Sequence, residues 1–86
     1  MTKTRIDKWL FQARFYRTRV LAQAAASAGK VRLNGVRVTK PAQAVKPGDI
    51  LTLGRGAEMV ALRVLALAER RGSAPQAQQL YEIVAD

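Results

Sequence analysis

The chain has 86 residues, 49% hydrophobic and 24% charged, which is enough for one domain with a modest core and too apolar for a disordered polymer. It contains no Cys and no His, so disulfides, Cys/His metal sites and an imidazole general base are excluded. Fifteen basic and six acidic residues give a net charge of +9, and the absence of a membrane-length apolar run or a secretory leader makes the cytoplasm the expected location.

The first third of the chain carries the pattern of two helices. Thr4 and Asp7 fit a capping pair for a helix over about 5–15, followed by apolar residues at helical spacing. Thr18 suits the start of a second helix, and Gly29 suits its end. The alanine-rich run between them indicates two helices that pack closely.

A hairpin is predicted over about 30–39. Asn34-Gly35 is a strong signal for a two-residue turn, because both central residues must adopt a positive φ. The resulting register places Arg32 opposite Arg37, a like-charge pair that destabilises an antiparallel ladder by up to ~1 kcal/mol. The predicted apolar face of this hairpin comprises Val31, Leu33, Val36 and Val38. We interpret the opposed arginines as half of a binding surface, where a nearby phosphate relieves their repulsion.

The second half predicts further strands and a closing helix. A turn at 46–49 precedes a strand over 50–53, and the segment 58–69 permits a helix or a strand, with its flanking glycines favouring a long strand. Residues 75–85 predict a short helix that docks through Leu80, Ile83 and Val84. We therefore expect an α+β fold with two N-terminal helices packed on a small, mostly antiparallel sheet and a short C-terminal helix.

The positive charge is concentrated in one half of the chain. Residues 1–48 contain eleven basic residues and one acid, whereas residues 49–86 contain four basic residues and five acids. A charge that merely improves solubility would be spread out, so this segregation indicates a polyanion site, with a solvated basic face as the alternative. Phosphate-loop, nucleophile-elbow and paired-carboxylate patterns are absent from the sequence. We expect no catalysis, no cofactor and no metal.

The candidate binding groups converge on the two helices and the hairpin. At the start of the second helix, backbone N–H groups, a hydroxyl and arginines together suit a phosphate. The candidate polar groups are Arg5, Lys8, Arg17, Thr18, Arg19, Lys30, Arg32, Arg37, Lys40 and Lys46. Phe15 and Tyr16 are candidates for stacking on bases, although such side chains also pack in cores. The turn alone is a sufficient structural reason for Asn34. A contact from its side chain to a base or ribose is an additional hypothesis.

The order of these residues closely resembles the alpha-L RNA-binding motif, the domain named after small-subunit ribosomal protein S-four. The resemblance is carried by Arg5-Ile6-Asp7-Lys8-Trp9-Leu10, Phe15, Thr18-Arg19, Ala22, Gly29, Val31, Asn34-Gly35, Lys40-Pro41, Val45 and Gly48-Asp49. Residues 66–82 are similar to the region after the motif in the small ribosome-associated heat-shock proteins of this family. The resemblance implies a single domain over 1–86, with the motif over 4–53 and a strand, loop and closing helix over 54–86.

The resemblance also implies a function. Members of this family present the two helices and the hairpin to structured RNA. The heat-shock members are implied to bind free large ribosomal subunits that retain a nascent chain on transfer RNA. They are also implied to help recycle these blocked subunits. The residues implied to contact RNA are Arg5, Lys8, Arg17, Thr18, Arg19, Lys30, Arg32, Asn34 and Lys40. We expect a non-catalytic, stress-related monomer whose partners are ribosomal RNA and transfer RNA, with no membrane.

Two alternatives stay open at this point. One is a general nucleic-acid binder, including duplex DNA, because phosphate contacts alone do not distinguish RNA from DNA. The other is a protein-interaction or anionic-membrane module. A membrane-surface helix pairs one basic face with a large apolar face. The basic residues here are distributed over helix, loop and hairpin, which argues against it.

Overall fold

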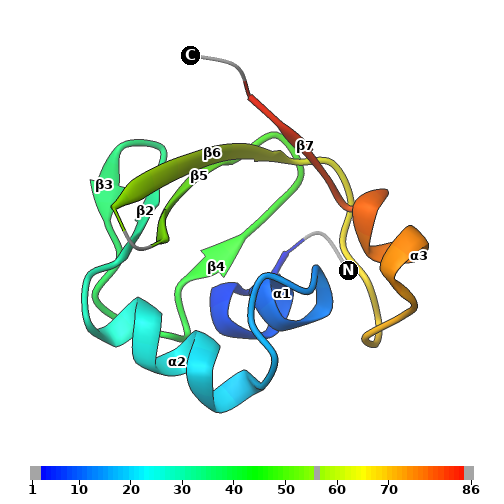
Figure 1. The fold of residues 1–86 in the computed structure, drawn as a ribbon, viewed down its shortest axis with the longest axis horizontal. Coiled ribbons are helices and arrows are strands. Elements are labelled where there is room, and N and C mark those ends of the chain that lie inside the picture. Colours follow the sequence, from blue (N-terminus) through cyan, green and yellow to red (C-terminus); the bar gives the residue numbers. More distant parts are fainter. Residues whose placement is uncertain (1–2, 56, 85–86) are drawn as a thin grey trace.

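The computed structural model describes residues 3–55 and 57–84, and it has two layers, with helices α1 and α2 beneath a twisted sheet (Figure 1). The helices are α1 (Ile6–Gln12), α2 (Arg19–Ser27) and α3 (Ala74–Gln78). The strands are β1 (Thr4–Arg5), β2 (Val31–Leu33), β3 (Val36–Arg37), β4 (Ala44–Val45), β5 (Ile50–Arg55), β6 (Glu58–Val64) and β7 (Tyr81–Ile83). None of the helices in the described ranges has the length and apolar character needed to cross a membrane.

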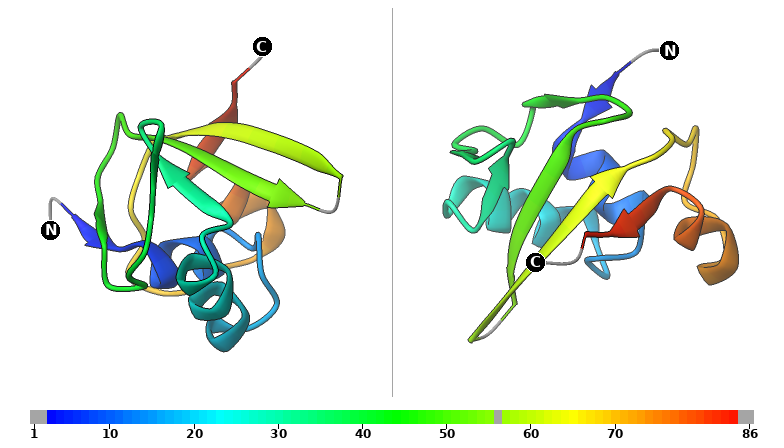
Figure 2. Two further views of the ribbon diagram at one scale, coloured as in Figure 1. Left: turned by 90° about the vertical axis from the view of Figure 1, so that its left-hand side faces the viewer. Right: turned by 90° about the horizontal axis from the view of Figure 1, so that it is seen from above.

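The main sheet has five strands in the order β3-β2-β5-β6-β7, and every neighbouring pair is antiparallel. A separate two-stranded ribbon joins β1 to β4. Both α1 and α2 lie on the same side of the main sheet (Figure 2). The predicted α+β class, with two N-terminal helices on a mostly antiparallel sheet, is therefore confirmed.

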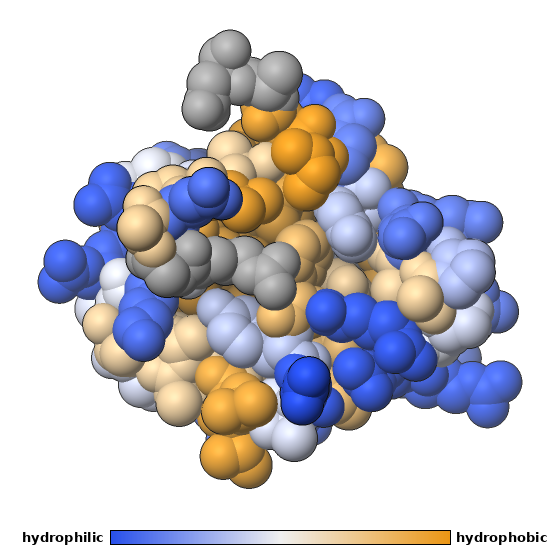
Figure 3. Space-filling model, in the orientation of Figure 1, coloured by the Kyte–Doolittle hydropathy of each residue, from blue (hydrophilic) through white to orange (hydrophobic). Residues whose placement is uncertain are grey.

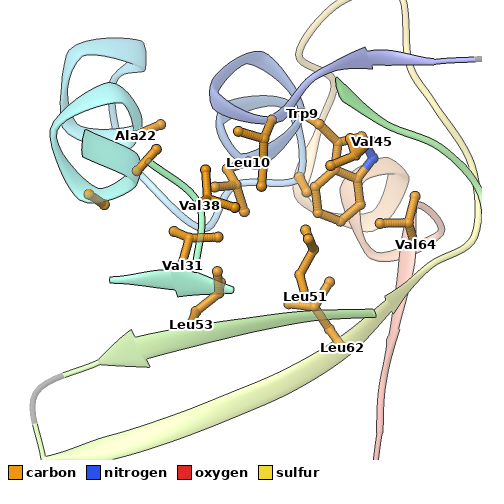
Figure 4. Close-up of a cluster of buried hydrophobic side chains, with 14 residues drawn as sticks. Trp9, Leu10, Ala22, Val31, Val38, Val45, Leu51, Leu53, Leu62 and Val64 are labelled. Atoms are coloured by element: carbon orange, nitrogen blue, oxygen red, sulfur yellow. The ribbon is translucent and has the colours of Figure 1, made fainter. Parts of the chain in front are cut away.

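The core fills the space between α1, α2 and the sheet (Figure 4). Its fully buried large apolar side chains are Ile6, Trp9, Leu10, Val31, Val45, Leu51, Leu53, Leu62 and Val64. Ala22 and Ala26 are also fully buried, and their small side chains let α2 approach α1, as the alanine-rich run predicts. The buried Trp9 indole donates a 2.9 Å hydrogen bond from Nε1 to the carbonyl oxygen of Ala66, so its polar atom is satisfied.

For the first helix, expected over about 5–15, the predicted Thr4 cap is wrong, and so is the predicted end, because the helix stops at Gln12, before the left-handed Arg14. The helix begins at Ile6 and spans 7 residues, while Thr4 pairs with β4 and provides no cap. The N–H groups of Ile6 and Asp7 donate instead to the carbonyl oxygens of Gln43 and Pro41, at 2.7 and 3.3 Å. A distant backbone segment thus satisfies the donors that a capping side chain would otherwise satisfy.

The second helix begins and ends as predicted. The Thr18 hydroxyl accepts a 3.1 Å hydrogen bond from the N–H of Leu21, which caps the first turn of α2. At the other end Gly29 has a φ of 75°, a left-handed conformation that glycine adopts without steric cost. This glycine turns the chain from α2 into β2.

The hairpin register is also confirmed. Asn34 and Gly35 have positive φ angles of 51° and 85°, and Arg32 lies directly opposite Arg37. One expectation fails, because Val36 is 70% exposed and does not join the core. The hairpin is anchored by the other apolar side chains of its predicted face.

The C-terminal segment differs from the prediction. The region 58–69 forms a strand, as favoured, but β6 ends at Val64, and α3 is only 5 residues long. Tyr81–Ile83 then forms the strand β7 instead of extending the helix. The reason is the open edge of β6, where β-prone residues gain ladder hydrogen bonds that a final helical turn would not provide. Leu80 packs against the core as expected, whereas Ile83 is 60% exposed.

Candidate nucleic-acid interface

A buried carboxylate organises the helical part of the basic surface. Asp7 is fully buried at the start of α1, and its oxygens accept hydrogen bonds from Arg5 Nε and Nη2 at 3.1 and 2.9 Å. The N–H of Lys8 donates to the same carboxylate at 2.7 Å, and Arg19 Nε of α2 lies 3.9 Å away. Asp7 thus holds two arginines from different elements beside each other, while both arginine side chains remain almost half exposed, at 47% and 42%.

The ionisation of Asp7 follows from these contacts. Burial raises the pKa of the Asp7 carboxyl, but hydrogen bonds from Arg5, the Lys8 N–H and Gln23 outweigh burial and leave the pKa below its usual value. The carboxylate is therefore charged at neutral pH. A guanidinium has five N–H donors, so Arg5 keeps donors beyond its two bonds to Asp7.

The start of α2 places Arg17 and Arg19 on either side of the capping residue Thr18. The Arg17 side chain is exposed, whereas Arg19 is partly covered by its approach to Asp7. The Thr18 oxygen accepts a hydrogen bond from the helix, and its hydroxyl proton can still be donated to a ligand such as a phosphate.

The polar face of the hairpin carries the second part of the surface. Arg32 and Arg37 are both exposed and paired across β2 and β3, with Lys30 exposed at the base. The Arg37 side chain crosses directly over Gly29. A Cβ added at that glycine would lie only 3.0 Å from Arg37 Cδ, which shows how closely the two residues approach. The end of α2 and the hairpin therefore meet at this arginine.

Asn34 and Lys46 share a network around the buried Asp49. Asn34 Nδ2 donates to Asp49 Oδ1 at 3.2 Å, and Asn34 Oδ1 accepts from the N–H of Ile50 at 2.9 Å. Lys46 Nζ contacts the same carboxylate at 2.9 Å. Burial raises the pKa of Asp49, but the bonds from Lys46 and Asn34 outweigh it and leave that pKa lowered. Both candidates thus have structural partners, and their RNA contacts stay predictions.

The two aromatic candidates differ in their surroundings. Phe15 is partly buried, with its ring centroid 6.3 Å from that of Trp9 and 4.6 Å from that of Tyr81. This cluster connects the helices to β7 and accounts for Phe15 by packing. Tyr16 lines a shallow hollow beside α2 and is the aromatic candidate that borders open surface. Contact of either side chain with RNA stays a prediction.

The remaining cations extend the surface on both sides. Lys8 lies on α1 and is partly exposed, and Lys40 follows the hairpin and is exposed. Within residues 3–55 and 57–84, no carboxylate lies at ion-pairing distance from six of the candidates. These six are Lys8, Arg17, Lys30, Arg32, Arg37 and Lys40. Their charge is available to an external anion.

Sequence reasoning assigned Asp7 only to the start of a helix and missed its contact with two arginines. The spacing of Arg5 and Asp7 was the available signal, since Arg5 is the extended residue directly before α1 and its side chain reaches the carboxylate in the first turn. The approach of Arg19 from α2 had no local signal, because it depends on how α1 and α2 pack. The hollows beside Gly29 and Gly54 were likewise unforeseen.

The fold and its exposed cations define a small α+β domain with an extended basic surface. The chain belongs to the S4 domain family, whose model matches residues 4–51. This confirms the resemblance on which the sequence-based expectation depends.

Known relatives cover nearly the whole chain. A heat shock protein 15 homologue of Aeromonas salmonicida is 48% identical over 81 residues, which are 94% of this chain and 61% of the relative. The RQC P-site tRNA stabilizing factor of Listeria monocytogenes is 34% identical over 96% of this chain and 88% of its own length. A solved structure of heat shock protein 15 from Vibrio cholerae, described as trimeric, has a TM-score of 0.90 and 42% identity, covering 96% of this chain and 83% of that one. The chain therefore spans about three fifths of the heat shock protein 15 homologue it matches.

Proposed function

We propose that this chain is a non-catalytic RNA-binding protein of the ribosome-associated heat-shock type. The observation that carries the proposal is the set of six exposed or partly exposed cations without a described carboxylate partner, on the helix-hairpin surface of an S4 domain. Lysine and arginine at such a surface neutralise phosphates and release counterions. The domain would then recognise the form of a folded RNA and not a long sequence.

The proposed partner is ribosomal RNA of the large subunit, with transfer RNA as a neighbouring contact. Similarity to heat shock protein 15 and to a factor named for stabilising P-site transfer RNA supports this assignment. The proposed role is the handling of large subunits that retain a nascent chain, in the cytoplasm. The proposed contacts are Arg5, Lys8, Arg17, Thr18, Arg19, Lys30, Arg32, Asn34, Arg37 and Lys40, with Phe15, Tyr16 and Lys46 as further candidates.

The test is sedimentation of the tagged protein with cell extract through a sucrose gradient at several salt concentrations. We expect co-migration with free large subunits that weakens steeply as salt rises, because counterion release makes phosphate binding salt-dependent. Treatment of the extract with ribonuclease is the control and should return the protein to the top of the gradient. Co-migration only with small RNAs, or equal competition by duplex DNA, would instead favour a general nucleic-acid binder.

The same gradient tests the oligomeric state. We expect a monomer, whereas the Vibrio cholerae protein is described as trimeric. Sedimentation of the isolated protein over a range of concentrations distinguishes the two. A constant monomer mass fits our expectation, and a mass that rises threefold with concentration contradicts it.

A further inference from the structure

Two shallow hollows meet where α2 joins the sheet, away from the cluster around Asp7. The first, of about 360 Å³, is lined by Gly29, Lys30, Arg32, Gly54 and Met59. The second, of about 340 Å³, is lined by Tyr16, Leu21, three alanines of α2, Lys30 and Gly54. Lys30 and Gly54 border both hollows, and the Gly54 N–H donates a 3.0 Å hydrogen bond to the Lys30 carbonyl oxygen. Each volume falls in the lower range of small-ligand sites.

The floor of the second hollow, where α2 lines it, is made of small apolar side chains. Ala24, Ala25 and Ala28 present no atom beyond Cβ on this side of α2, and Gly54 presents none from β5. The bordering apolar side chains are solvent-exposed, with Leu21 at 49% and, beside the first hollow, Met59 at 59%. Figure 3 shows an apolar patch at the lower edge of the molecule, over α2. The apolar face of a ligand can lie against such a lining.

The rim of the hollows is cationic. Lys30 stands between them, Arg32 borders the first, and Arg37 reaches over the adjoining Gly29. No described carboxylate pairs with these three side chains. A nucleotide carries a flat base and a phosphate, which match the floor and the rim respectively. A second copy of this chain would instead bring another net charge of +9 toward the same cations.

We propose that these hollows hold one unpaired base of the bound RNA, with its phosphate at Lys30. This inference rests on the proposed function and adds a preference to it: the protein binds RNA with a looped-out nucleotide more tightly than RNA in which every base is stacked in a duplex. The base lies on the alanines of α2, and the flanking phosphates reach Arg32 and Arg37. Recognition in these hollows depends on contact with the flat face of the base. Because all four bases have such a face, we expect no strong sequence preference.

The test uses two hairpin RNAs with the same number of phosphates, one with an intact five-nucleotide loop and one whose loop nucleotides lack their bases. Wild-type protein should bind the intact loop about 5-fold more tightly, the lower end of the range for a base stacked on an aromatic side chain, because the base here lies on alanines. Ala24→Leu fills the floor without changing charge and should remove this preference. Ser27→Leu adds the same bulk elsewhere on α2 and should preserve it. Equal binding of both hairpins by the wild type would overturn the proposal.

A second variant blocks the hollow from the sheet. A Cβ at Gly54 would lie 3.7 Å from its nearest neighbours, so Gly54→Val fits the strand and projects into the hollow. If Ala24→Leu fails to fold, loss of base preference in Gly54→Val supports the proposal and retention overturns it. Free large subunits serve as a further probe: weaker binding by Gly54→Val than by Ser27→Leu is expected, and equal binding overturns the proposal.

The remaining outcomes separate the two proposals. Failure of the wild type to bind either hairpin or large subunits would refute the proposed function and this inference together. Binding of subunits with unchanged affinity in both blocking variants would refute only the base site. If the wild type self-associates without RNA and Ala24→Leu does not, then a second copy occupies the hollow and the base site is wrong.

Discussion

The two halves of the chain use their charges in opposite ways. In the first half the one acid, Asp7, is buried, whereas most of the basic side chains stay exposed. In the second half Arg63 pairs with the exposed Glu82 of β7, and Arg71 lies 4.7 Å over the Phe11 ring and donates to its carbonyl oxygen. Most basic residues of the first half face solvent without a described carboxylate partner, whereas Arg63 and Arg71 of the second half have partners within the protein.

The comparison shows that a basic surface depends on where the acids lie as well as on the number of basic residues. Asp7 and Asp49 are buried and pair with the partly exposed Arg5 and Lys46, so neither acid stands as an exposed anion. The predictions below alter each half in a matched way.

The largest expected effect is on RNA binding by the first half. Arg32→Ala with Arg37→Ala removes two exposed cations, and we expect affinity for large subunits to fall by about 100-fold or more at moderate salt. The slope of log affinity against log salt should decrease by about two units if each arginine contacts one phosphate. Filter binding over a salt series measures both quantities.

The matched control is Arg63→Ala with Arg70→Ala, which removes the same charge from exposed positions in the second half. We expect affinity and slope to stay near those of the wild type. If both double variants weaken binding equally, the charge difference between the halves has no functional meaning.

The next effect is on stability. Asp7→Asn keeps the size of the side chain but loses its charge-assisted bonds to Arg5 and the approach of Arg19, and we expect the free energy of unfolding to fall by about 2–3 kcal/mol. Urea denaturation measures this loss. Glu82→Gln is the control, since an exposed pair contributes less than about 1 kcal/mol. A loss at Asp7 no larger than at Glu82 would contradict a structural role for the buried carboxylate.

The same variant predicts a change in pH dependence. Because contacts in the folded state lower the pKa of Asp7, the unfolded state binds more protons in acid, so this stabilisation is complete above about pH 5 and is lost as the pH falls below about 4. The wild type should therefore lose stability in this range more steeply than Asp7→Asn. Asp49 has its pKa lowered as well, so the variant keeps part of the slope.

The smallest effect belongs to the second half. Arg63→Ala should lower the free energy of unfolding by less than about 1 kcal/mol, because both partners of its ion pair are almost half exposed and screened by water. Thermal denaturation at low and high salt measures it, and the small difference should shrink further in high salt. A loss of several kcal/mol would mean that the edge strand β7 depends on this pair.

Much of the fold was predictable because it follows local rules. Asn34-Gly35 determined a register that the structure reproduces, and Thr18 and Gly29 marked both ends of α2. These signals depend on backbone angles and on hydrogen bonds within a few residues. The basic hairpin could therefore be located from the sequence.

The errors occur where a distant segment competes with a local pattern. Thr4 has the right type and spacing for a cap, but Gln43 and Pro41 bring carbonyl groups to the same N–H donors. Tyr81 and Ile83 continue an apparent helical pattern. They form a strand instead, because the open edge of β6 offers hydrogen-bonding partners for β7. For the same reason the approach of Arg19 to Asp7 could not be foreseen, since it requires the packing of two helices.

Gly29 links two properties that a mutational scan usually separates, namely folding and ligand binding. It ends α2 with a positive φ, and its missing side chain leaves the space that Arg37 occupies. Any substitution there strains the backbone, and its Cβ also requires the Arg37 side chain to shift by a few tenths of an ångström. A survey of tolerated sequences that selects for folding, and another that selects for ligand binding, should therefore reject the same changes at this residue. Such pleiotropy makes position 29 a poor place to alter affinity alone, and engineering should leave it intact.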